Sequence, residues 1–369
     1  MKENNILVIN PGSTTTKIAV YKNQEELFQK KIDHAQDSEF QKKYKGPHNI
    51  FDQFEDRSQK IEEVLEANGI NHLDAVVGRG GMLPSVKKSG TYSVNSKMLE
   101  DLETRALANH ASNLGIPLAK KLAEAFNIPD KAFTVDPVTT DEILDKYKYT
   151  GIKEIKRYAG WHCLNQKAVS RRYAESINKN YEDLNLIVAH LGGGSSFGAH
   201  KKGRTVNVIN ALSGEGTPTP ERSGSIPAQS LTELCFSGKY TKEEILHFVA
   251  GGGGLASLLG TKDVYGLRQQ YEKGTLLQES LDILDFIITG FSQNVLSMKP
   301  CLELKENEKV DQIIITGGLA HWPLVTDKIK KETSLITQGV TVYPGEFELE
   351  ALRDGTLRII NGEEKAKEY

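Results

Sequence analysis

The segment ILVINPGSTTTKIAVYKN (Ile6–Asn23) has a counterpart in the second half of the chain, LIVAHLGGGSSFGAHKKG (Leu186–Gly203). Each reads as an apolar strand, a turn of small and hydroxyl residues, and a second strand that ends in basic residues. A gapless alignment pairs Asn10 with His190, Gly12 with Gly192, Thr15 with Ser195, Thr16 with Ser196 and Lys22 with Lys202. Because the copies begin at positions 6 and 186 of a 369-residue chain, we predict a duplicated domain.

The turn of each copy favours a β-hairpin over the phosphate loops that lead into a helix. Glycine permits a tight turn and the close approach of a ligand, and Thr14–Thr16 followed by Ile18–Val20 favours a strand on exit. P-loops and Rossmann turns run into a helix, and the pattern G-x-x-x-x-G-K-[ST] is absent. Hydroxyls, backbone amides and a lysine are nevertheless groups that surround a phosphate, so we expect the first hairpin to face one.

Composition limits the class of protein. A chain of 369 residues is long for one domain, so two are expected. The formal net charge of -3 gives no electrostatic reason to expect nucleic acid or a membrane surface as the main partner. The widely spaced Cys163, Cys235 and Cys301 argue against a disulfide framework or a zinc site and fit a reducing cytosol. No apolar stretch predicts a secretory signal or a membrane span, so we expect a cytoplasmic protein.

The remaining chain alternates between strands and helices, as an α/β protein does. Leu73–Gly81 predicts a strand whose turn carries Arg79, and Ala132–Thr140 predicts a strand that delivers Asp136. Asn113–Phe126 and Leu281–Met298 read as helices, the second largely buried. Val310–Trp322 reads as a strand that runs into a turn at Gly317 and Gly318. Open α/β sheets bind ligands at strand ends, where these turns are expected.

Polar groups gather at the predicted turns, namely Asn10, Ser13, Thr14, Lys17, Arg79, Asp136, His162, His190, Arg222 and Glu348. Two arginines, a lysine and two histidines beside glycine and hydroxyl loops suit a polyanion. Phosphoryl transfer needs such a set, because its catalysis is chiefly positioning and charge neutralisation. Carboxylates and an asparagine are hard oxygen ligands suited to Mg²⁺. The residues alone therefore predict phosphate binding and leave transfer open.

Each of these residues also has a structural interpretation. Arg79 could be a solvated surface charge, although its glycine neighbours leave the guanidinium open to an anion. His162 could be a structural histidine, and Asp136 before a proline could be an Asx-turn residue. The tetraglycine Gly251–Gly254 predicts a flexible turn before a helix. The cysteines are expected to be small core residues.

Eight short motifs run through nearly the whole chain: INPGSTTTK, GRGG, FTVDP, RYAGWH, HLGGGSS, ERSGSIP, TGGLAHW and PGEFELEALRDG. Together they resemble the motifs of the acetate and butyrate kinase (acetokinase) family, and the likeness is greatest to its butyrate kinase branch. That family belongs to the actin, hexokinase and Hsp70 superfamily. Any one of these motifs alone is a weak indication, whereas the ordered set is specific.

The resemblance implies roles for individual residues. It implies catalytic roles for Arg79, Asp136, His162 and Arg222. It implies that ATP or ADP is bound by Asn10, Ser13, Thr14, Thr15, Lys17, His190, Gly192, Gly193, Gly194, Ser195, Gly317 and Gly318. It implies that Mg²⁺ is linked to Asn10 and to a C-terminal carboxylate, for which we prefer Glu348 over Glu346 because Phe347 falls on the family's glutamate.

The chain departs from the family pattern at four places. Gln166 stands where the family has the second histidine of G-F-H-G-T-S-H, and Ser225 replaces the first aspartate of G-D-I-D. The adenosine turn reads LAHW where the family has I-G-E-N, so the resemblance implies base contacts there only through the two glycines. The fourth departure is Phe347. The two arginines, Asp136 and His162 remain, so we expect an active enzyme.

The fold implied is α/β, with two duplicated RNase H-like domains around a central cleft. The expected N-terminal domain is 1–150 with a C-terminal crossover segment at 345–369, and 151–344 is the nucleotide-binding domain. The implied reaction is reversible phosphoryl transfer from ATP to a short-chain carboxylate, most simply butyrate, in a homodimeric enzyme. The alternatives are a branched-chain, acetate or propionate kinase, a sugar kinase of the superfamily, and a non-catalytic ATP-binding protein.

Overall fold

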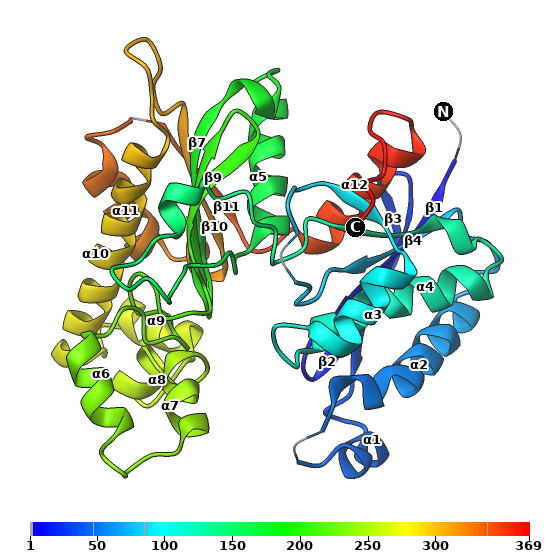
Figure 1. The fold of residues 1–369 in the computed structure, drawn as a ribbon, viewed down its shortest axis with the longest axis horizontal. Helices are drawn as coiled ribbons and strands as arrows, with labels where there is room; N and C mark the ends of the chain where they lie inside the picture. Colours follow the sequence, from blue (N-terminus) through cyan, green and yellow to red (C-terminus); the bar gives the residue numbers. More distant parts are fainter. Residues whose placement is uncertain (1–2, 47, 85, 338) are drawn as a thin grey trace. The chain divides into compact units, whose positions relative to one another are not determined.

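The computed structural model describes residues 3–46, 48–84, 86–337 and 339–369. The chain divides into two compact units (Figure 1). Unit 1 comprises Met1–Asp141 and Phe347–Tyr369, and unit 2 comprises Glu142–Glu346. Each unit is built around its own mixed sheet and is described by itself.

The sheet of unit 1 has the order β3-β2-β1-β4-β6-β5. Its strands are β1 (Asn5–Pro11), β2 (Thr15–Lys22), β3 (Glu25–Asp33), β4 (Ala75–Arg79), β5 (Thr91–Ser93) and β6 (Ala132–Val135). β1 and β2 form the predicted antiparallel hairpin, in which Asn10 lies opposite Lys17. β1, β4 and β6 are parallel. Parallel strands end at one edge of a sheet, so Asn10, Arg79 and Asp136 lie along the same edge.

The helices of unit 1 are α1 (Ser38–Lys43), α2 (Phe54–Ala67), α3 (Ser96–Arg105), α4 (Gly115–Ala125) and α12 (Glu348–Ile360), with 3-10 turns η1 (Ile50–Gln53), η2 (Ala111–Leu114) and η3 (Pro129–Lys131). The predicted apolar face of α4 is buried, with Leu118 and Leu122 fully enclosed. α4 begins in close contact with the end of β4. A Cβ added to Gly115 would lie only 2.2 Å from the carbonyl oxygen of Arg79, so glycine is needed there. This close approach fixes the backbone that carries Arg79.

The sheet of unit 2 has the order β11-β10-β7-β8-β9. Its strands are β7 (Asn185–Leu191), β8 (Ser195–Lys201), β9 (Arg204–Ile209), β10 (Gln312–Gly317) and β11 (Val340–Pro344). β7 and β8 form the second predicted hairpin, with His190 opposite Ser196. β7 and β11 flank β10 in parallel, as β1 and β6 flank β4 in unit 1. The sequence repeat therefore corresponds to a repeat of strand order and direction, and the prediction of a duplicated α/β fold is confirmed.

The helices of unit 2 are α5 (Cys163–Ser176), α6 (Ala228–Cys235), α7 (Lys242–Val249), α8 (Leu255–Leu258), α9 (Val264–Glu272), α10 (Gln278–Cys301) and α11 (Pro323–Thr333), with 3-10 turns η4 (Asp145–Lys148), η5 (Tyr181–Asp183) and η6 (Gly318–His321). Figure 1 shows α5 on one face of the sheet and α10 and α11 on the other. α10 is the predicted buried helix, and Phe291 and Val295 are fully enclosed in its core.

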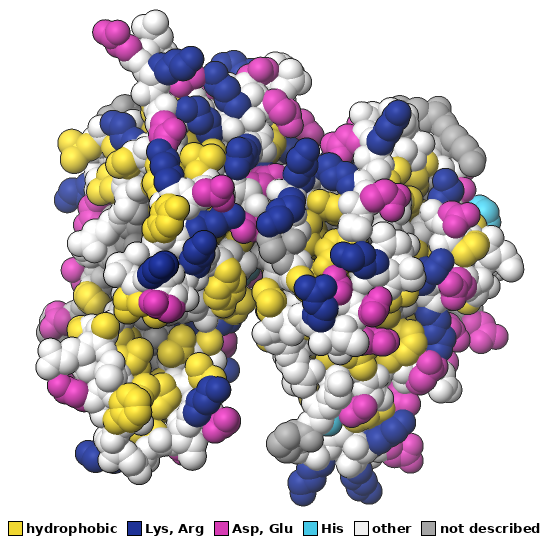
Figure 2. Space-filling model, viewed as in Figure 1, with side chains coloured by type: hydrophobic (Ala, Val, Ile, Leu, Met, Phe, Trp, Pro, Cys, Tyr) yellow, Lys and Arg dark blue, Asp and Glu magenta, His cyan; other side chains and the backbone are white. Residues whose placement is uncertain are grey.

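The surface agrees with the composition, whereas the expectation that the cysteines are core residues is wrong for Cys235. Side chains of both charge signs are interspersed over the face of the molecule drawn in Figure 2. Cys163 and Cys301 are buried, Cys235 is exposed, and all three are free thiols. Across 3–46, 48–84, 86–337 and 339–369, no helix combines the length and the apolar character needed to cross a membrane.

Candidate active site

The turn of the first hairpin is exposed on its outer side and held from within by a residue that the sequence reasoning missed. Ser13, Thr14 and Lys17 are exposed. Arg57 of α2 is fully buried, and its guanidinium donates to the carbonyl oxygens of Gly12 at 2.9 Å and Ser13 at 3.1 Å. Burial lowers the pKa of Arg57 to about 10, which leaves the side chain charged at neutral pH.

Arg57 determines which groups the turn presents outward. In a planar trans peptide the carbonyl and the following N–H point in opposite directions. Because the carbonyls of Gly12 and Ser13 point to Arg57, the N–H groups of Ser13 and Thr14 point away from it. The outer side of the turn is therefore a set of amides and hydroxyls suited to an anion. In the sequence, Arg57 lies on the same helix face as the apolar Ile61 and Leu65. This shared face could have predicted that Arg57 is buried.

A cluster of Asn10, Arg79 and Glu348 lies at the edge of the same sheet. Arg79 binds Glu348 in bidentate fashion, with Nη2–Oε1 at 2.7 Å and Nη1–Oε2 at 2.9 Å. Asn10 donates from Nδ2 to Glu348 Oε2 at 2.7 Å and accepts from Arg79 Nη1 at 3.3 Å. Glu348 is the first residue of α12, where the helix dipole also favours a carboxylate.

Arg79 keeps one edge of its guanidinium available while it binds Glu348. The Glu348 carboxylate takes the edge formed by Nη1 and Nη2. The Nε–H group is buried and has no hydrogen-bond partner among the described residues. Nε–H and the second Nη2 hydrogen form the other bidentate edge of an arginine. Arg79 is therefore not a solvated surface charge, and it can hold a second carboxylate or a phosphate beside Glu348.

Asp136 is buried at the end of β6 in an unusual backbone conformation. Its φ is 43°, in the left-handed region that few residues other than glycine adopt. Its Oδ1 accepts from the N–H of Gly90 at 2.6 Å, 46 residues away in sequence. An Asx turn would instead bind a residue two positions on. The carboxylate is therefore held by a distant segment of the chain, and a strained carboxylate at a strand end is a hypothesis of function.

In unit 2, His162 and His190 stack on each other. Their ring centroids are 3.7 Å apart and the rings are 4° from parallel. His190 ends β7, and its Nδ1 lies 2.9 Å from Nδ2 of Asn165. Nε2 of His190 is buried without a hydrogen bond in the described chain and lies 3.5 Å from a carboxylate oxygen of Glu346.

The glycine turn after β7 lies against the predicted second arginine. A Cβ added to Gly194 would lie 3.3 Å from Nε and from Nη2 of Arg222. Nε of Arg222 is another buried donor without a partner among the described residues, and burial lowers the pKa of this guanidinium. The turn itself is tied down by Gly193, whose carbonyl oxygen accepts from Thr219 Oγ1 at 2.6 Å. A buried guanidinium thus lies directly beside the glycine turn in unit 2.

The tetraglycine Gly251–Gly254 does precede α8, as predicted, but it also packs against the loop that carries Arg222. The N–H of Gly251 donates to the carbonyl oxygen of Glu221 at 2.7 Å. Gly254 has φ 64°, and a Cβ there would lie 1.7 Å from the carbonyl oxygen of Thr219. Close packing therefore requires glycine at position 254. The sequence predicted only a flexible turn and did not reveal this packing.

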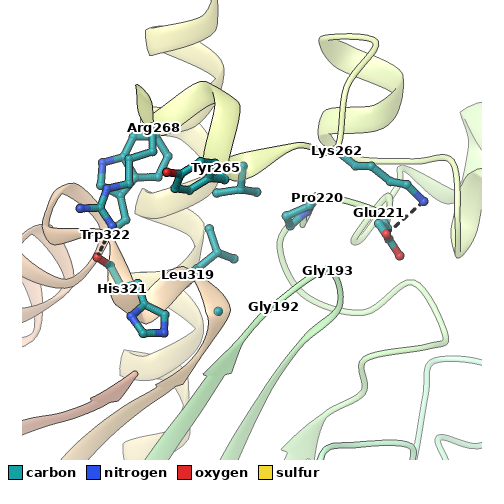
Figure 3. A pocket seen from close by; sticks show the side chains of 12 residues that line it. Gly192, Gly193, Pro220, Glu221, Lys262, Tyr265, Arg268, Leu319, His321 and Trp322 are labelled. Carbon is teal, nitrogen blue, oxygen red and sulfur yellow. Dashed lines mark hydrogen bonds and ion pairs between the residues drawn. The ribbon is translucent and has the colours of Figure 1, made fainter. Parts of the chain in front are cut away.

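A cavity of about 470 Å³ connects the glycine turn with the predicted adenosine turn (Figure 3). Its lining residues are Gly192, Gly193, Pro220, Glu221, Lys262, Val264, Tyr265, Arg268, Gly318, Leu319, His321 and Trp322. Arg268 donates to the carbonyl oxygen of His321 at 2.8 Å, and Lys262 pairs with Glu221 at 3.2 Å. A mostly apolar cavity with charged groups at its rim is typical of a small-molecule site.

The structure therefore brings the predicted residues into two groups. In unit 1, Asn10, Arg79 and Glu348 are in direct contact, and Asp136 and the hairpin turn with Ser13, Thr14, Thr15 and Lys17 belong to the same sheet. In unit 2, His162 stacks on His190, and the segment of Gly192, Gly193, Gly194 and Ser195 lies beside Arg222. Gly318 lines the cavity, and Gly317 ends β10.

Comparison with solved structures shows which known proteins share the fold of this chain. The chain resembles the acetate kinase of Porphyromonas gingivalis with a TM-score of 0.73 and 16% identity, covering 97% of this chain and 100% of that chain. It resembles a propionate kinase from Francisella tularensis with a TM-score of 0.72 and 19% identity, covering 95% and 98% of the two chains. The chain therefore shares the duplicated α/β fold of these two proteins.

Sequence comparison narrows the class to a family. The model of the acetokinase family matches residues 5–326. Butyrate kinase 2 of Clostridium acetobutylicum is 44% identical over 368 residues, and a probable butyrate kinase of Clostridium botulinum (strain Alaska E43) is 45% identical over 366 residues. Each alignment covers 99% of both chains. The chain belongs to the acetokinase family, as the resemblance of its motifs predicted.

Proposed function

We propose that this chain is a butyrate kinase, which transfers the γ-phosphoryl group of ATP to the carboxylate of butyrate and forms butyryl phosphate and ADP reversibly. The observation that carries the proposal is the 44–45% identity, over 99% of both chains, to proteins named butyrate kinase or probable butyrate kinase. The two groups of buried donors support phosphoryl transfer, because they suit the spread negative charge of its transition state.

Unit 2 (142–346) is the proposed nucleotide-binding domain. The cavity beside Gly318 would take the adenosine, with Trp322 and Tyr265 as its aromatic walls. The amides of Gly192–Gly194 would contact the phosphates, and Nε2 of His190 would donate to them. This assignment is supported by the shared lining of one cavity by the glycine turn and by the turn after β10.

Unit 1 (1–141 with the returning segment 347–369) is the proposed acceptor domain. The available edge of Arg79 would bind the butyrate carboxylate, and the outward N–H groups of Ser13 and Thr14 would bind the transferring phosphoryl group. Lys17 would add a positive charge beside the same turn. Asp136 would orient the acceptor or a metal-bound water rather than act as a base, since the acceptor is already a carboxylate at neutral pH.

Mg²⁺ is the proposed metal, and the donors of unit 1 fit it through water. Across the described residues, no group of three or more His, Cys, Asp or Glu side chains is arranged to hold a metal directly. Glu348 is a single carboxylate whose two oxygens already accept from Arg79 and Asn10. Mg²⁺ keeps several of its waters and is usually bound through one or two carboxylates and the substrate phosphates. When bound, it would neutralise phosphate charge.

The transfer itself would be an in-line displacement. The bond from the γ-phosphorus to the bridging oxygen of ADP breaks as the bond from a butyrate oxygen to that phosphorus forms. His162 and Arg222 would bind the equatorial oxygens, where negative charge gathers. No proton has to be removed from the acceptor, so the residues act by orientation and by charge.

A substrate series tests the proposal. The purified protein would be given ATP, Mg²⁺ and one acid of a series from acetate to valerate, with isobutyrate included, and acyl phosphate would be trapped with hydroxylamine. We expect the highest kcat/KM for butyrate. A higher value for acetate, propionate or isobutyrate would assign another acid, and nucleotide binding without trapped product would favour a non-catalytic protein.

We also propose that the enzyme is a homodimer in the cytoplasm. The dimer is the expectation from the family, and the exposed Phe236 and Leu246 of unit 2 are apolar side chains that an interface would cover. The three free thiols fit a reducing compartment. Light scattering after gel filtration would give a mass of twice 40.9 kDa for a dimer, and 40.9 kDa would contradict it.

A further inference from the structure

We propose that Gln166 is a positioning residue, and that a one-way chain of hydrogen bonds from Tyr181 through His200, Gln166 and Ser196 holds the proton of His162 on Nε2. This inference rests on the proposed function only in giving His162 a role in phosphoryl transfer. Gln166 is the position at which the chain departs from the family's second histidine, and the sequence provided no role for it.

The orientation of the Gln166 amide is fixed by a main-chain group. Gln166 is fully buried on α5, with Nε2 lying 3.1 Å from the main-chain oxygen of Ser196 and 2.9 Å from its Oγ. A main-chain carbonyl can only accept a hydrogen bond. The nitrogen of the Gln166 amide must therefore face Ser196, and its oxygen faces the other way.

The hydroxyl of Ser196 then has one partner left to which it can donate. Its Oγ accepts from Gln166 Nε2 at 2.9 Å and from the main-chain N–H of His162 at 3.3 Å. With both lone pairs used, its hydrogen is directed to Nδ1 of His162 at 2.8 Å. Nδ1 of a neutral His162 is therefore the acceptor, and Nε2 carries the proton.

The oxygen of the Gln166 amide continues the same direction of hydrogen-bond donation. Its Oε1 can only accept, so Nε2 of His200, at 3.0 Å, must carry a hydrogen. Burial lowers the pKa of His200 well below its usual value, so the ring is neutral and Nδ1 accepts from the hydroxyl of Tyr181 at 2.6 Å. A Cβ added to Gly198 would lie 2.4 Å from Gln166 Oε1 and 2.7 Å from His200 Nε2. Glycine therefore makes room for this contact.

A separate set of contacts gives His190 the same tautomer. The hydroxyl of Thr316 donates to the carbonyl oxygen of Gly345 at 3.1 Å, so it must accept from Asn165 Nδ2 at 3.2 Å. The second hydrogen of that nitrogen is directed to Nδ1 of His190 at 2.9 Å. The adjacent Asn165 and Gln166 of α5 thus each set one ring of the stacked pair.

The shared tautomer has a chemical consequence. Two imidazolium rings stacked at 3.7 Å would repel each other. Two neutral rings, each with its proton on Nε2, avoid this repulsion and supply two N–H donors from one stack. In the proposed reaction they would donate to oxygens of the transferring phosphoryl group, and a His162 with its proton on Nδ1 would face the substrate with a lone pair instead.

The test is a spectroscopic measurement on the protein without substrates. Two-bond ¹H–¹⁵N correlation spectra at about pH 8, where an unperturbed histidine is neutral, distinguish protonated from unprotonated ring nitrogens. Loss of one signal set in His162→Gln assigns the ring. We expect His162 with its proton on Nε2. A proton on Nδ1, or a rapid mixture of tautomers, would overturn the proposal.

The variant Gln166→Glu is expected to reverse the direction of hydrogen-bond donation between Ser196 and His162. A carboxylate oxygen facing Ser196 would accept the hydroxyl hydrogen, so Oγ would be left to accept from Nδ1–H of His162. We expect the proton of His162 to move to Nδ1 and kcat with butyrate to fall roughly 10²-fold, the usual cost of losing one transition-state donor, with KM little changed. Unchanged His162 signals in this variant would contradict the proposal.

Two further variants keep the test independent of folding and of substrate identity. Gln312→Met changes another buried glutamine of unit 2, at the start of β10, and should leave the His162 signals as they are. Ser196→Ala removes the donor to Nδ1 and should produce a mixture of tautomers. If the unmodified protein has the Nε2 proton but does not phosphorylate butyrate, the proposed function fails and the tautomer assignment stands.

Discussion

At the scale of single residues, Arg57 is the clearest case of a side chain that acts through others. It is enclosed in unit 1, and its guanidinium binds the carbonyl oxygens of Gly12, Ser13 and Thr15. Without the guanidinium all three carbonyls would lose this partner, although Thr15 would still accept from the N–H of Gly12. The orientation of the outward N–H groups, which we propose bind phosphate, therefore depends on a residue that need not touch substrate.

We expect Arg57→Met to destabilise the protein by about 2–3 kcal/mol, because the partly buried carbonyls of Gly12 and Ser13 lose their charged partner. Turnover should fall as well, since the turn would no longer present its N–H groups outward. Urea unfolding and the hydroxylamine assay measure the two effects. Arg105→Met, at a side chain 63% exposed, is the matched control and should change neither. A fully active, fully stable Arg57→Met would refute this role.

Glu348 and Glu346 are the two candidates for the carboxylate linked to the proposed Mg²⁺. Glu348 binds Arg79 and Asn10, whereas Glu346 is exposed and lies 3.5 Å from Nε2 of His190. We expect Glu348→Gln to raise the Mg²⁺ concentration needed for half-maximal rate by about 10-fold or more. Glu346→Gln should change that concentration little. The reverse result would move the metal-linked role to Glu346.

At the scale of elements, the tetraglycine and the loop of Arg222 form one packed unit. Gly254 and Gly260 share a positive φ, 64° and 68°, but only Gly254 has backbone atoms where a Cβ would go. Because Gly254 has ψ -135°, outside the left-handed region that alanine can adopt, kcat rather than unfolding free energy is the readout that reports displacement of the Arg222 loop.

We expect Gly260→Ala to cost about 1–2 kcal/mol of unfolding free energy, the penalty of a left-handed alanine, without a change in kcat. Gly254→Ala should cost more and should also lower kcat, because Thr219 and Arg222 must move. Thermal or urea unfolding with parallel rate measurements decides this. Equal effects of the two substitutions on kcat would show that the packing does not position Arg222.

The elements also show what the sequence could predict and what it could not. Asn10, Arg79 and Asp136 were placed correctly because strand ends can be read from apolar runs, and parallel strands bring their ends to one edge. The contacts of Gln166 and Arg57 could not be predicted, because their partners come from segments that only folding brings near. The Arg79–Glu348 pair, 269 positions apart, is of the same kind.

For the protein as a whole, His34 links the stability of the fold to the turn of the first hairpin. His34 is buried, and its Nε2 lies 2.8 Å from Thr16 Oγ1, which also accepts from Arg57. Burial, with the nearby charge of Arg57, lowers the pKa of His34 to about 4. The folded protein therefore binds a proton at this ring less readily than the unfolded chain does.

Because the folded pKa lies below the unfolded value of about 6.5, stability should fall as pH drops below that value. From about pH 8 to about pH 5 we expect His34 to account for a loss of about 2 kcal/mol. Urea unfolding of the unmodified protein and of His34→Gln across this range isolates the contribution. The variant should show the shallower pH dependence, and identical slopes would contradict the assignment.

Acyl phosphate formation by the unmodified protein and by Arg222→Ala, measured in parallel with butyrate, ATP and Mg²⁺, decides whether this protein phosphorylates a carboxylate. We predict trapped butyryl hydroxamate in equal amount to ADP for the unmodified protein. For a folded Arg222→Ala we predict kcat/KM lower by about 10²-fold or more. ADP without hydroxamate would contradict the proposed function, and equal rates for the two proteins would contradict the proposed role of Arg222.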